Sequence, residues 1–302
     1  MARIALKVDV DTLRGTREGV PRLLEILDRA GVRATFLFSL GPDHTGWALR
    51  RLFRPGFLSK VSRTSVVRHY GLSTLVYGVL MPGPDIGRVA AGNMQAVRNA
   101  GHECGIHAWD HVLWQDNVRR RSAEWTRRQM ALAFARFQDI FGQAPATHGA
   151  AGWQMNDAAL EQIDEWGMPY ASDGRGRAPF VPTVRGRPLA HVQLPTTLPT
   201  LDELIGIDGA DGDEATRALL ERGEGEADQV FTLHAELEGG AFAPTLTALL
   251  AGWRAQGHAL GSLASIYQGI RRDTLPRSEA TWMTVPGRSG EVMGSLPGTG
   301  QD

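Results

Sequence analysis

Large apolar residues alternate with smaller or polar ones near the start of the chain, over residues 4–10. A period of two is typical of a β-strand, because successive side chains point to opposite faces. The apolar face of this predicted strand consists of Ile4, Leu6, Val8 and Val10. The opposite face ends in two carboxylates, Asp9 and Asp11. We therefore expect a strand that delivers two acids to one point.

The pattern then changes to helical spacing and back again. Residues 16–30 carry one apolar stripe and are followed by Gly31, a typical helix stop, and residues 34–40 form a nearly continuous apolar run. Further helices are expected at 87–100, 123–141, 157–166 and 243–255, with Asn156 as one N-cap. Further strands are expected at 102–106, 146–149, 170–172, 191–194 and 229–234. This alternation predicts an α/β fold.

Two stretches depart from that pattern. Residues 41–85 lie after the second predicted strand and combine many apolar residues with basic ones, without one acid between His44 and Pro84. Such a mixture is typical of a segment that faces anionic lipid, although a covering subdomain with a solvated basic rim would look the same. From residue 276 onward periodicity is lost, so we expect one catalytic unit over 1–275 and a mobile tail over 276–302.

Composition narrows the function classes. The chain has 302 residues and a formal net charge of -1, which gives no reason to expect nucleic acid as a partner. Its single cysteine, Cys104, excludes an internal disulfide and fits a reducing compartment. Charged residues occur within the first ten positions, where a secretory signal would need an uninterrupted apolar run. No apolar run is long enough to span a bilayer. We expect a cytoplasmic protein.

Side chains suited to metal chemistry stand at three predicted strand ends. Asp9 and Asp11 end the first strand, His107 and His111 follow the strand at 102–106, and His234 ends the strand at 229–234. One carboxylate and two imidazoles are a ligand set found in hydrolytic metal sites, and they leave a coordination position open for water. The other carboxylate is then available as a general base, and His234 as a general acid. Taken singly, these residues could equally be a turn cap or a core histidine.

Three phrases resemble the polysaccharide deacetylase (NodB-homology) superfamily: KVDVDT at 7–12, HAWDH at 107–111 and FTLH at 231–234. The resemblance implies a distorted (β/α)7 barrel that hydrolyses N-acyl groups on sugars with one divalent metal. It makes Asp9 the base and His234 the acid. The implied metal ligands are Asp11, His107 and His111. Zn²⁺ is the expected ion, with Co²⁺, Mn²⁺ or Ni²⁺ as alternatives.

Longer phrases are similar to the ArnD-type deformylases of this superfamily, among them RGTREGVP at 14–21, AAGW at 150–153 and TLHAE at 232–236. The resemblance implies hydrolysis of the formamide of 4-deoxy-4-formamido-L-arabinose phosphoundecaprenol at the cytoplasmic face of the inner membrane. The anionic surface of that membrane is then an expected partner. Residues assigned to substrate or lipid binding are Arg50, Arg51, Arg54, Lys60, Trp153 and Arg175.

One motif departs from the superfamily pattern. The third motif usually has an arginine that orients the base, whereas residues 147–153 read THGAAGW. Arg175 or Arg177 could replace it, Asp173 could pair with His234, and Asp110 could fix an imidazole tautomer. Two other functions stay open at this point: a deacetylase of another N-acyl sugar, and a non-catalytic lipid-binding protein with a structural metal.

Overall fold

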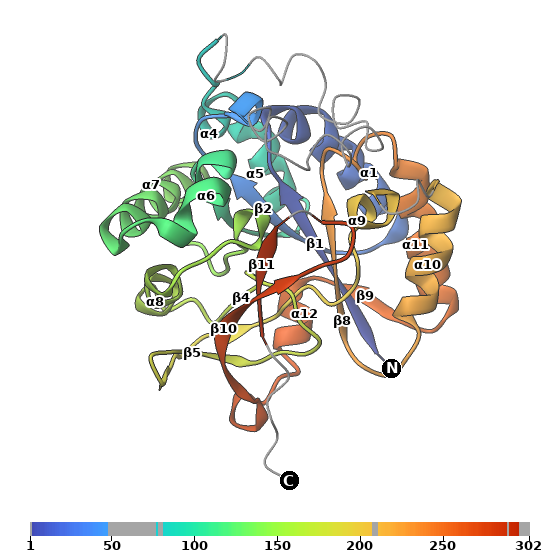
Figure 1. Cartoon of the computed structure of the whole chain (residues 1–302). Coiled ribbons are helices and arrows are strands. Elements are labelled where there is room, and N and C mark those ends of the chain that lie inside the picture. Colours follow the sequence, from blue (N-terminus) through green and yellow to red (C-terminus); the bar gives the residue numbers. More distant parts are fainter. Residues whose placement is uncertain (1, 48–76, 78–80, 207–210, 289, 296–302) are drawn as a thin grey trace.

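A parallel sheet built around the first strand forms one side of the molecule (Figure 1). The computed structural model describes residues 2–47, 77, 81–206, 211–288 and 290–295. β1 (Arg3–Val10) pairs in parallel with β2 (Thr35–Ser39) and β8 (Gln229–His234), and β2 pairs with β3 (Glu103–Ala108). β9 (Ala259–Gly261) pairs with the first residues of β1. The carboxyl ends of these strands therefore meet at one edge.

Backbone hydrogen bonds close this sheet into a barrel. Beyond β3, the Ile106 amide donates to the Thr147 carbonyl and the Ser172 amide to the His148 carbonyl. β4 (Tyr170–Ala171) pairs in parallel with β7 (Val192–Gln193), and the Thr197 amide returns to the carbonyl of Val230 in β8. The predicted distorted (β/α)7 barrel is confirmed. Its distortion lies where residues 146–149, expected as a strand, form only an isolated bridge.

Helices cover the outside of the barrel. Their capping follows the sequence signals: the Asn156 side chain accepts from the Ala159 amide, and Gly31 and Gly142 adopt φ of 59° and 68° at helix ends. The helices of four residues or more are α1 (Val20–Ala30), α4 (Ile86–Val89), α5 (Ala91–Asn99), α6 (His111–Asn117), α7 (Ala123–Phe141), α8 (Asp157–Glu165), α9 (Leu201–Gly206), α10 (Gly212–Gly223), α11 (Ala243–Ala255) and α12 (Leu263–Tyr267), with a π-helical turn over Gly15–Gly19.

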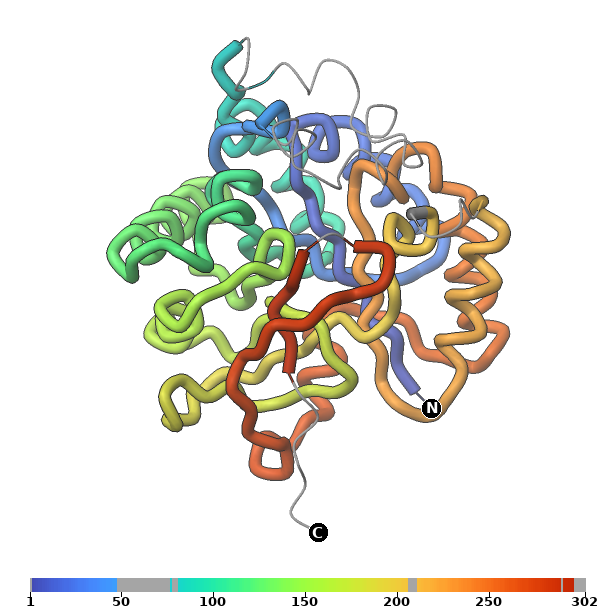
Figure 2. Tube along the Cα trace, in the orientation of Figure 1, coloured from blue at the N-terminus to red at the C-terminus, as the bar shows by residue number. Residues whose placement is uncertain are grey.

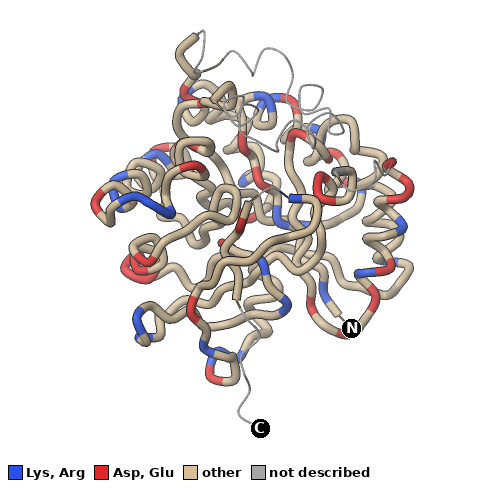
Figure 3. Tube along the Cα trace, viewed as in Figure 1, with Lys and Arg blue, Asp and Glu red and all other residues tan. Residues whose placement is uncertain are grey.

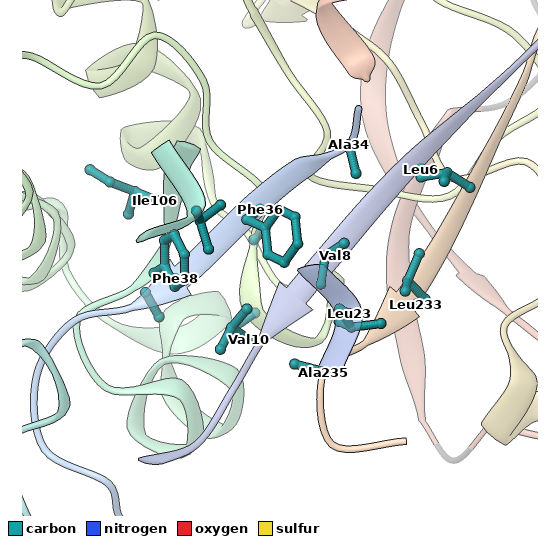
Figure 4. Close-up of a cluster of buried hydrophobic side chains, with 14 of the residues drawn as sticks. Leu6, Val8, Val10, Leu23, Ala34, Phe36, Phe38, Ile106, Leu233 and Ala235 are labelled. Atoms are coloured by element: carbon teal, nitrogen blue, oxygen red, sulfur yellow. The ribbon is translucent and has the colours of Figure 1, made fainter. Parts of the chain in front are cut away.

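The two faces of β1 have different surroundings. Val8 and Val10 point outward with Phe36 and Phe38 of β2 into the core beneath Leu23 of α1 (Figure 4). The inward face begins with Ala5, which packs in a second apolar cluster with residues of β4, β7, β8 and α12. That cluster fills the amino-terminal end of the barrel. The inward polar side chains of β1 therefore lie above an apolar floor.

The carboxyl-terminal residues form a hairpin. β10 (Arg277–Thr284) pairs antiparallel with β11 (Glu291–Ser295) and parallel with β5 (Val181–Val184), which also pairs with β6 (Arg187–Pro188). Figure 2 shows this red hairpin crossing the front of the barrel. Residues 277–288 and 290–295, expected to lie in a mobile tail, form this hairpin. Burial of Val292 and Met293, two apolar residues in a Gly- and Ser-rich context, holds the hairpin in place.

Most of the expected insert after β2 lies outside the described residues, including Arg50, Arg51, Arg54 and Lys60. Its described ends are residues 41–47 and 81–85, where His44 stacks on Trp47 at 3.9 Å between ring centroids. Elsewhere on the described surface both signs of charge are interspersed (Figure 3). Within the described ranges, none of the helices has the length and apolar character required to cross a membrane.

Candidate active site

Asp11, His107 and His111 converge at the carboxyl-terminal edge of the barrel. Asp11 follows β1, His107 lies within β3, and His111 is the first residue of α6. Asp11 Oδ1 lies 3.2 Å from His107 Nε2, and Asp11 Oδ2 lies 3.4 Å from His111 Nε2. One ligand atom from each residue falls within 4.8 Å of the others. This spacing suits a single divalent ion.

The hydrogen bonding of His107 supports a cation at this position. Its Nδ1 lies 2.6 Å from the Gly149 carbonyl, which can only accept, so Nδ1 carries the proton in the neutral ring. Nε2 then presents a lone pair toward Asp11 Oδ1, a buried oxygen without a hydrogen-bond partner. Burial opposes ionisation of Asp11, but His111 and His107, when their imidazoles are protonated, outweigh it and lower its pKa far below the usual value. An ionised carboxylate facing a lone pair fits a bound metal.

Asp9 lies beside the three residues and is held by a lysine. Lys7 Nζ donates to Asp9 Oδ2 at 2.9 Å, and both side chains are buried. The other oxygen of Asp9, Oδ1, has no hydrogen-bond partner and lies 3.8 Å from His107 Nδ1. One carboxylate oxygen is thus fixed by a cation, while the second is available to accept a proton.

His234 ends β8 directly opposite Asp9 in the strand register. Its Nδ1 lies 3.8 Å from Asp202 Oδ1, and its backbone amide donates to Glu238 Oε2 at 2.8 Å. Burial disfavours the imidazolium, but Asp202, Asp11 and other nearby carboxylates outweigh it and raise the pKa of His234 to about 9. The ring is therefore a proton donor at neutral pH, as a general acid requires.

Glu236 supports the turn that carries Asp11. Its Oε1 accepts from the Asp11 amide at 3.2 Å, the Thr12 amide at 2.9 Å and the Thr12 hydroxyl at 2.7 Å. Burial and the charge of Asp11 raise the pKa of Glu236 to about 8. A Cβ at Gly15 would lie only 2.0 Å from the same oxygen, so this position requires glycine. Sequence reasoning missed this support, because no spacing rule joins residues 12 and 236.

The sequence profile of the polysaccharide deacetylases matches residues 3–171, more than half of the chain. The chain belongs to the polysaccharide deacetylase family. It is a hydrolase that acts on amide C–N bonds. The matched residues include Asp9, Asp11, His107 and His111, whereas His234 lies beyond them.

Curated relatives are similar over most of their length. A protein of Shewanella sediminis is 38% identical over 239 residues, 79% of this chain and 77% of its own. A protein of Wigglesworthia glossinidia brevipalpis is 33% identical over 227 residues, 74% of this chain and 79% of its own. Both are named "probable 4-deoxy-4-formamido-L-arabinose-phosphoundecaprenol deformylase ArnD".

Solved structures of the family share the fold. A Mycobacterium smegmatis protein assigned as a polysaccharide deacetylase has a TM-score of 0.63 at 19% identity, with 94% of each chain covered. A family 4 acetyl xylan esterase from Clostridium thermocellum, solved with a cobalt ion, has a TM-score of 0.53 at 15% identity, with 91% of this chain and 96% of that chain covered. At these identities the likeness concerns the α/β architecture alone.

Three auxiliary residues named from the deacetylase motifs have other contacts in the structure. Asp173, expected to pair with His234, is bound to His148 Nδ1 at 2.6 Å and to Gln193 Nε2 at 2.7 Å. Asp110 caps α6 through the Leu113 amide and contacts His44 instead of a predicted ligand. These two acids follow strands or turns as expected, but their side chains point to other neighbours. Sequence position alone does not give that direction.

The third contact concerns the orientation of Asp9, for which the sequence left Arg175 or Arg177 open. Arg175 forms two hydrogen bonds with Glu203, at 3.0 and 3.1 Å, and its backbone amide donates to the Met293 carbonyl of the hairpin at 2.8 Å. Lys7 holds Asp9 instead. Trp153, assigned to substrate binding, is buried, and its ring centroid lies 5.5 Å from Lys7 Nζ and 5.1 Å from the Arg175 guanidinium carbon. Trp153 therefore packs between the side chains that border the site.

Proposed function

We propose that this protein is a metal-dependent deformylase that hydrolyses the formamide of 4-deoxy-4-formamido-L-arabinose phosphoundecaprenol. The products are formate and the free aminoarabinose lipid that serves lipid A modification. The names of the curated relatives support this substrate. The observation that carries the proposal is the placement of Asp9 and His234 at the same register of neighbouring strands, beside Asp11, His107 and His111.

The residues of the site divide the reaction between them. Asp11, His107 and His111 would hold one divalent ion, Zn²⁺ in our proposal, which supplies a Lewis acid for the formyl oxygen and lowers the pKa of water. Asp9 Oδ1 accepts a proton from the attacking water, while Lys7 fixes the second oxygen. His234 donates a proton to the amine nitrogen, because an amide anion is too basic to leave unprotonated.

We further propose that the enzyme works peripherally on the cytoplasmic face of the inner membrane. An undecaprenyl chain stays in the bilayer, so the barrel mouth must approach the surface where the sugar and its phosphate project. The segment over residues 41–85 follows β2 and is basic and apolar in sequence. Each basic residue near an anionic surface contributes about 1 kcal/mol of attraction.

The test is release of formate from the formamido-sugar lipid, compared with release of acetate from its acetamido analogue. We expect the Zn²⁺-loaded protein to release formate at least about tenfold faster, because the extra methyl group must be fitted next to the metal ligands. Acetate release alone would replace the proposal with a deacetylase of another N-acyl sugar. Stoichiometric Zn²⁺ binding without release of either acid would support the alternative of a non-catalytic lipid-binding protein with a structural metal.

A further inference from the structure

An arginine of the carboxyl-terminal hairpin reaches the active site. Arg288 lies between β10 and β11, and Figures 1 and 2 show this end of the hairpin beside α9. One guanidinium nitrogen lies 3.8 Å from Asp202 Oδ2 and 3.8 Å from Glu203 Oε1. The guanidinium carbon lies 4.2 Å from the centroid of the Trp153 ring, a distance typical of a cation–π contact.

Asp202 links this arginine to the proposed acid. Its Oδ2 faces Arg288, while its Oδ1 lies 3.8 Å from His234 Nδ1. Asp202 Oδ1 and His234 Nδ1 are both buried and have no hydrogen-bond partner. Burial opposes ionisation of Asp202, but the charges of His234 and Arg288 lower its pKa. One carboxylate is therefore shared by two cationic groups on opposite sides.

The second acid near Arg288 is already occupied. Glu203 receives both hydrogen bonds from Arg175, and its oxygen also accepts from the Thr200 amide at 3.1 Å. Since Glu203 is satisfied and fixed, it confines Arg288 from one side while Trp153 confines it from another. The guanidinium group thus lies against Trp153 and between the two acids. Among the described residues, Asp202 has no arginine partner other than Arg288.

We propose that Arg288 is a positioning residue for His234 and acts through Asp202, so that the hairpin completes the active site. This inference rests on the proposed function, in which His234 donates the proton to the amine. Arg288 fixes the Asp202 carboxylate, and the fixed carboxylate sets the orientation of the imidazole. The positive charge of Arg288 also offsets part of the negative charge that Asp202 exerts on His234.

The expected consequence of losing Arg288 follows from the charges that face His234. These are Asp202 from α9, Asp11 just after β1, Glu238 from the turn after β8, and Asp9 from β1. Without Arg288 the negative charge of Asp202 acts on His234 without opposition. The imidazolium then becomes a weaker acid and stays protonated to higher pH.

The test compares four variants of the full-length, metal-loaded enzyme in formate release: Arg288→Ala, Arg288→Lys, Asp202→Asn and Arg119→Ala. For Arg288→Ala we expect kcat to fall about 10- to 100-fold, as for other groups that orient a reactive side chain, with KM changed less than about threefold. The basic limb of the pH profile of kcat/KM should shift to higher pH by about half a unit. Lysine at position 288 should restore part of kcat. In Asp202→Asn the basic limb should move down.

Arg119→Ala is the matched control for hairpin docking. Arg119 pairs with Glu291 at 2.7 Å and stacks on Trp282 at 3.8 Å, so it holds the same hairpin without touching Asp202. We expect near wild-type kcat and pH dependence in this variant. If Arg119→Ala reproduced the loss, or if Arg288→Ala kept the wild-type kcat and basic limb, the positioning role would be wrong. Absence of formate release by the wild-type enzyme would instead refute the proposed function.

Discussion

The ammonium group of Lys7 lies 2.9 Å from Asp9 Oδ2 inside the barrel, with no exposed surface on the lysine side chain. The two residues are two positions apart on β1, so they share the inward face of the strand. Lys7 thereby takes the place of the arginine that is missing from residues 147–153. A positive charge thus lies next to the proposed base, although it comes from a different part of the chain.

The first prediction concerns the stability of this buried pair. Removing one partner leaves an unpaired buried charge, so Lys7→Met should lower the free energy of unfolding by about 3 to 5 kcal/mol. Lys7→Met combined with Asp9→Asn should be less destabilised than Lys7→Met alone, because no unpaired charge remains. Urea unfolding of the wild type, both single variants and the double variant measures this. Simple additivity of the two single changes would show that the pair is not coupled.

The second prediction separates the proposed base from a proposed metal ligand. Asp9→Asn keeps the size of the side chain and leaves Asp11, His107 and His111 in place. It should therefore bind the metal normally, while turnover falls at least about 100-fold. His107→Ala should lose both metal and turnover. Metal content by elemental analysis, together with formate release, distinguishes the two. Full activity of Asp9→Asn would mean that another group accepts the proton.

The third prediction tests the glycine beneath the Asp11 turn. In Gly15→Ala the new Cβ would lie 2.0 Å from Glu236 Oε1, the oxygen that holds the Asp11 and Thr12 amides. We expect a stability loss of about 1 to 3 kcal/mol and weaker metal binding. Gly92→Ala is the control, because a Cβ there meets no atom within 4 Å. It should stabilise the protein by about 0.5 to 1 kcal/mol and leave metal binding unchanged.

Six strands, β1, β2, β3, β4, β7 and β8, and the positions of the principal site residues could be predicted because they follow local rules. Alternation on β1 placed Asp9 and Asp11, and each of the expected histidines stands at or near a strand end. Lys7 was available from the same alternation, since residues 5, 7, 9 and 11 share a face. The third motif does not point to it, because the superfamily pattern has an arginine there.

Other parts of the site depend on contacts that no local pattern encodes. Asp202 lies 32 residues before His234 in the chain and approaches it only because α9 follows the segment that closes the barrel. The sequence suggested Asp173 as the partner of His234, yet the Asp173 side chain is bound to His148. The sequence does not predict the hairpin because β10 alternates weakly, with half of its residues exposed and the other half only partly buried. Pairing with β5 across about 100 residues stabilises it.

The fourth prediction concerns the basic segment after β2. If residues 41–85 bring the enzyme to an anionic membrane, charge reversal at Arg50, Arg51 and Arg54 should weaken binding to anionic liposomes about a hundredfold or more. Reversal at three exposed arginines elsewhere is the control: Arg29, Arg185 and Arg271. Co-sedimentation with anionic and neutral liposomes measures both. Equal effects of the two triple variants would argue for net charge alone and against a dedicated segment.

The fifth prediction is a pH effect on stability far from the active site. Burial, assisted by the nearby Arg33, lowers the pKa of His102 from its usual value to about 4. Its Nδ1 accepts a hydrogen bond from the Ala34 amide at 3.1 Å, which requires the unprotonated nitrogen. Because the folded pKa lies below the unfolded value near 6.5, the stabilisation is present above pH 6.5 and is lost as the pH falls toward 4.

His102 should therefore contribute about 2 kcal/mol to the loss of stability between pH 7 and pH 4. Replacement by asparagine keeps an acceptor near the Ala34 amide but removes the titrating group. The variant should be less stable than the wild type at pH 7, because it leaves a cavity beside Phe36, whose ring lies 5.2 Å from that of His102. The difference between the two proteins should then narrow as the pH is lowered. Urea midpoints at pH 7, 5.5 and 4 measure this, and a constant difference across that range would rule out His102 as the titrating group.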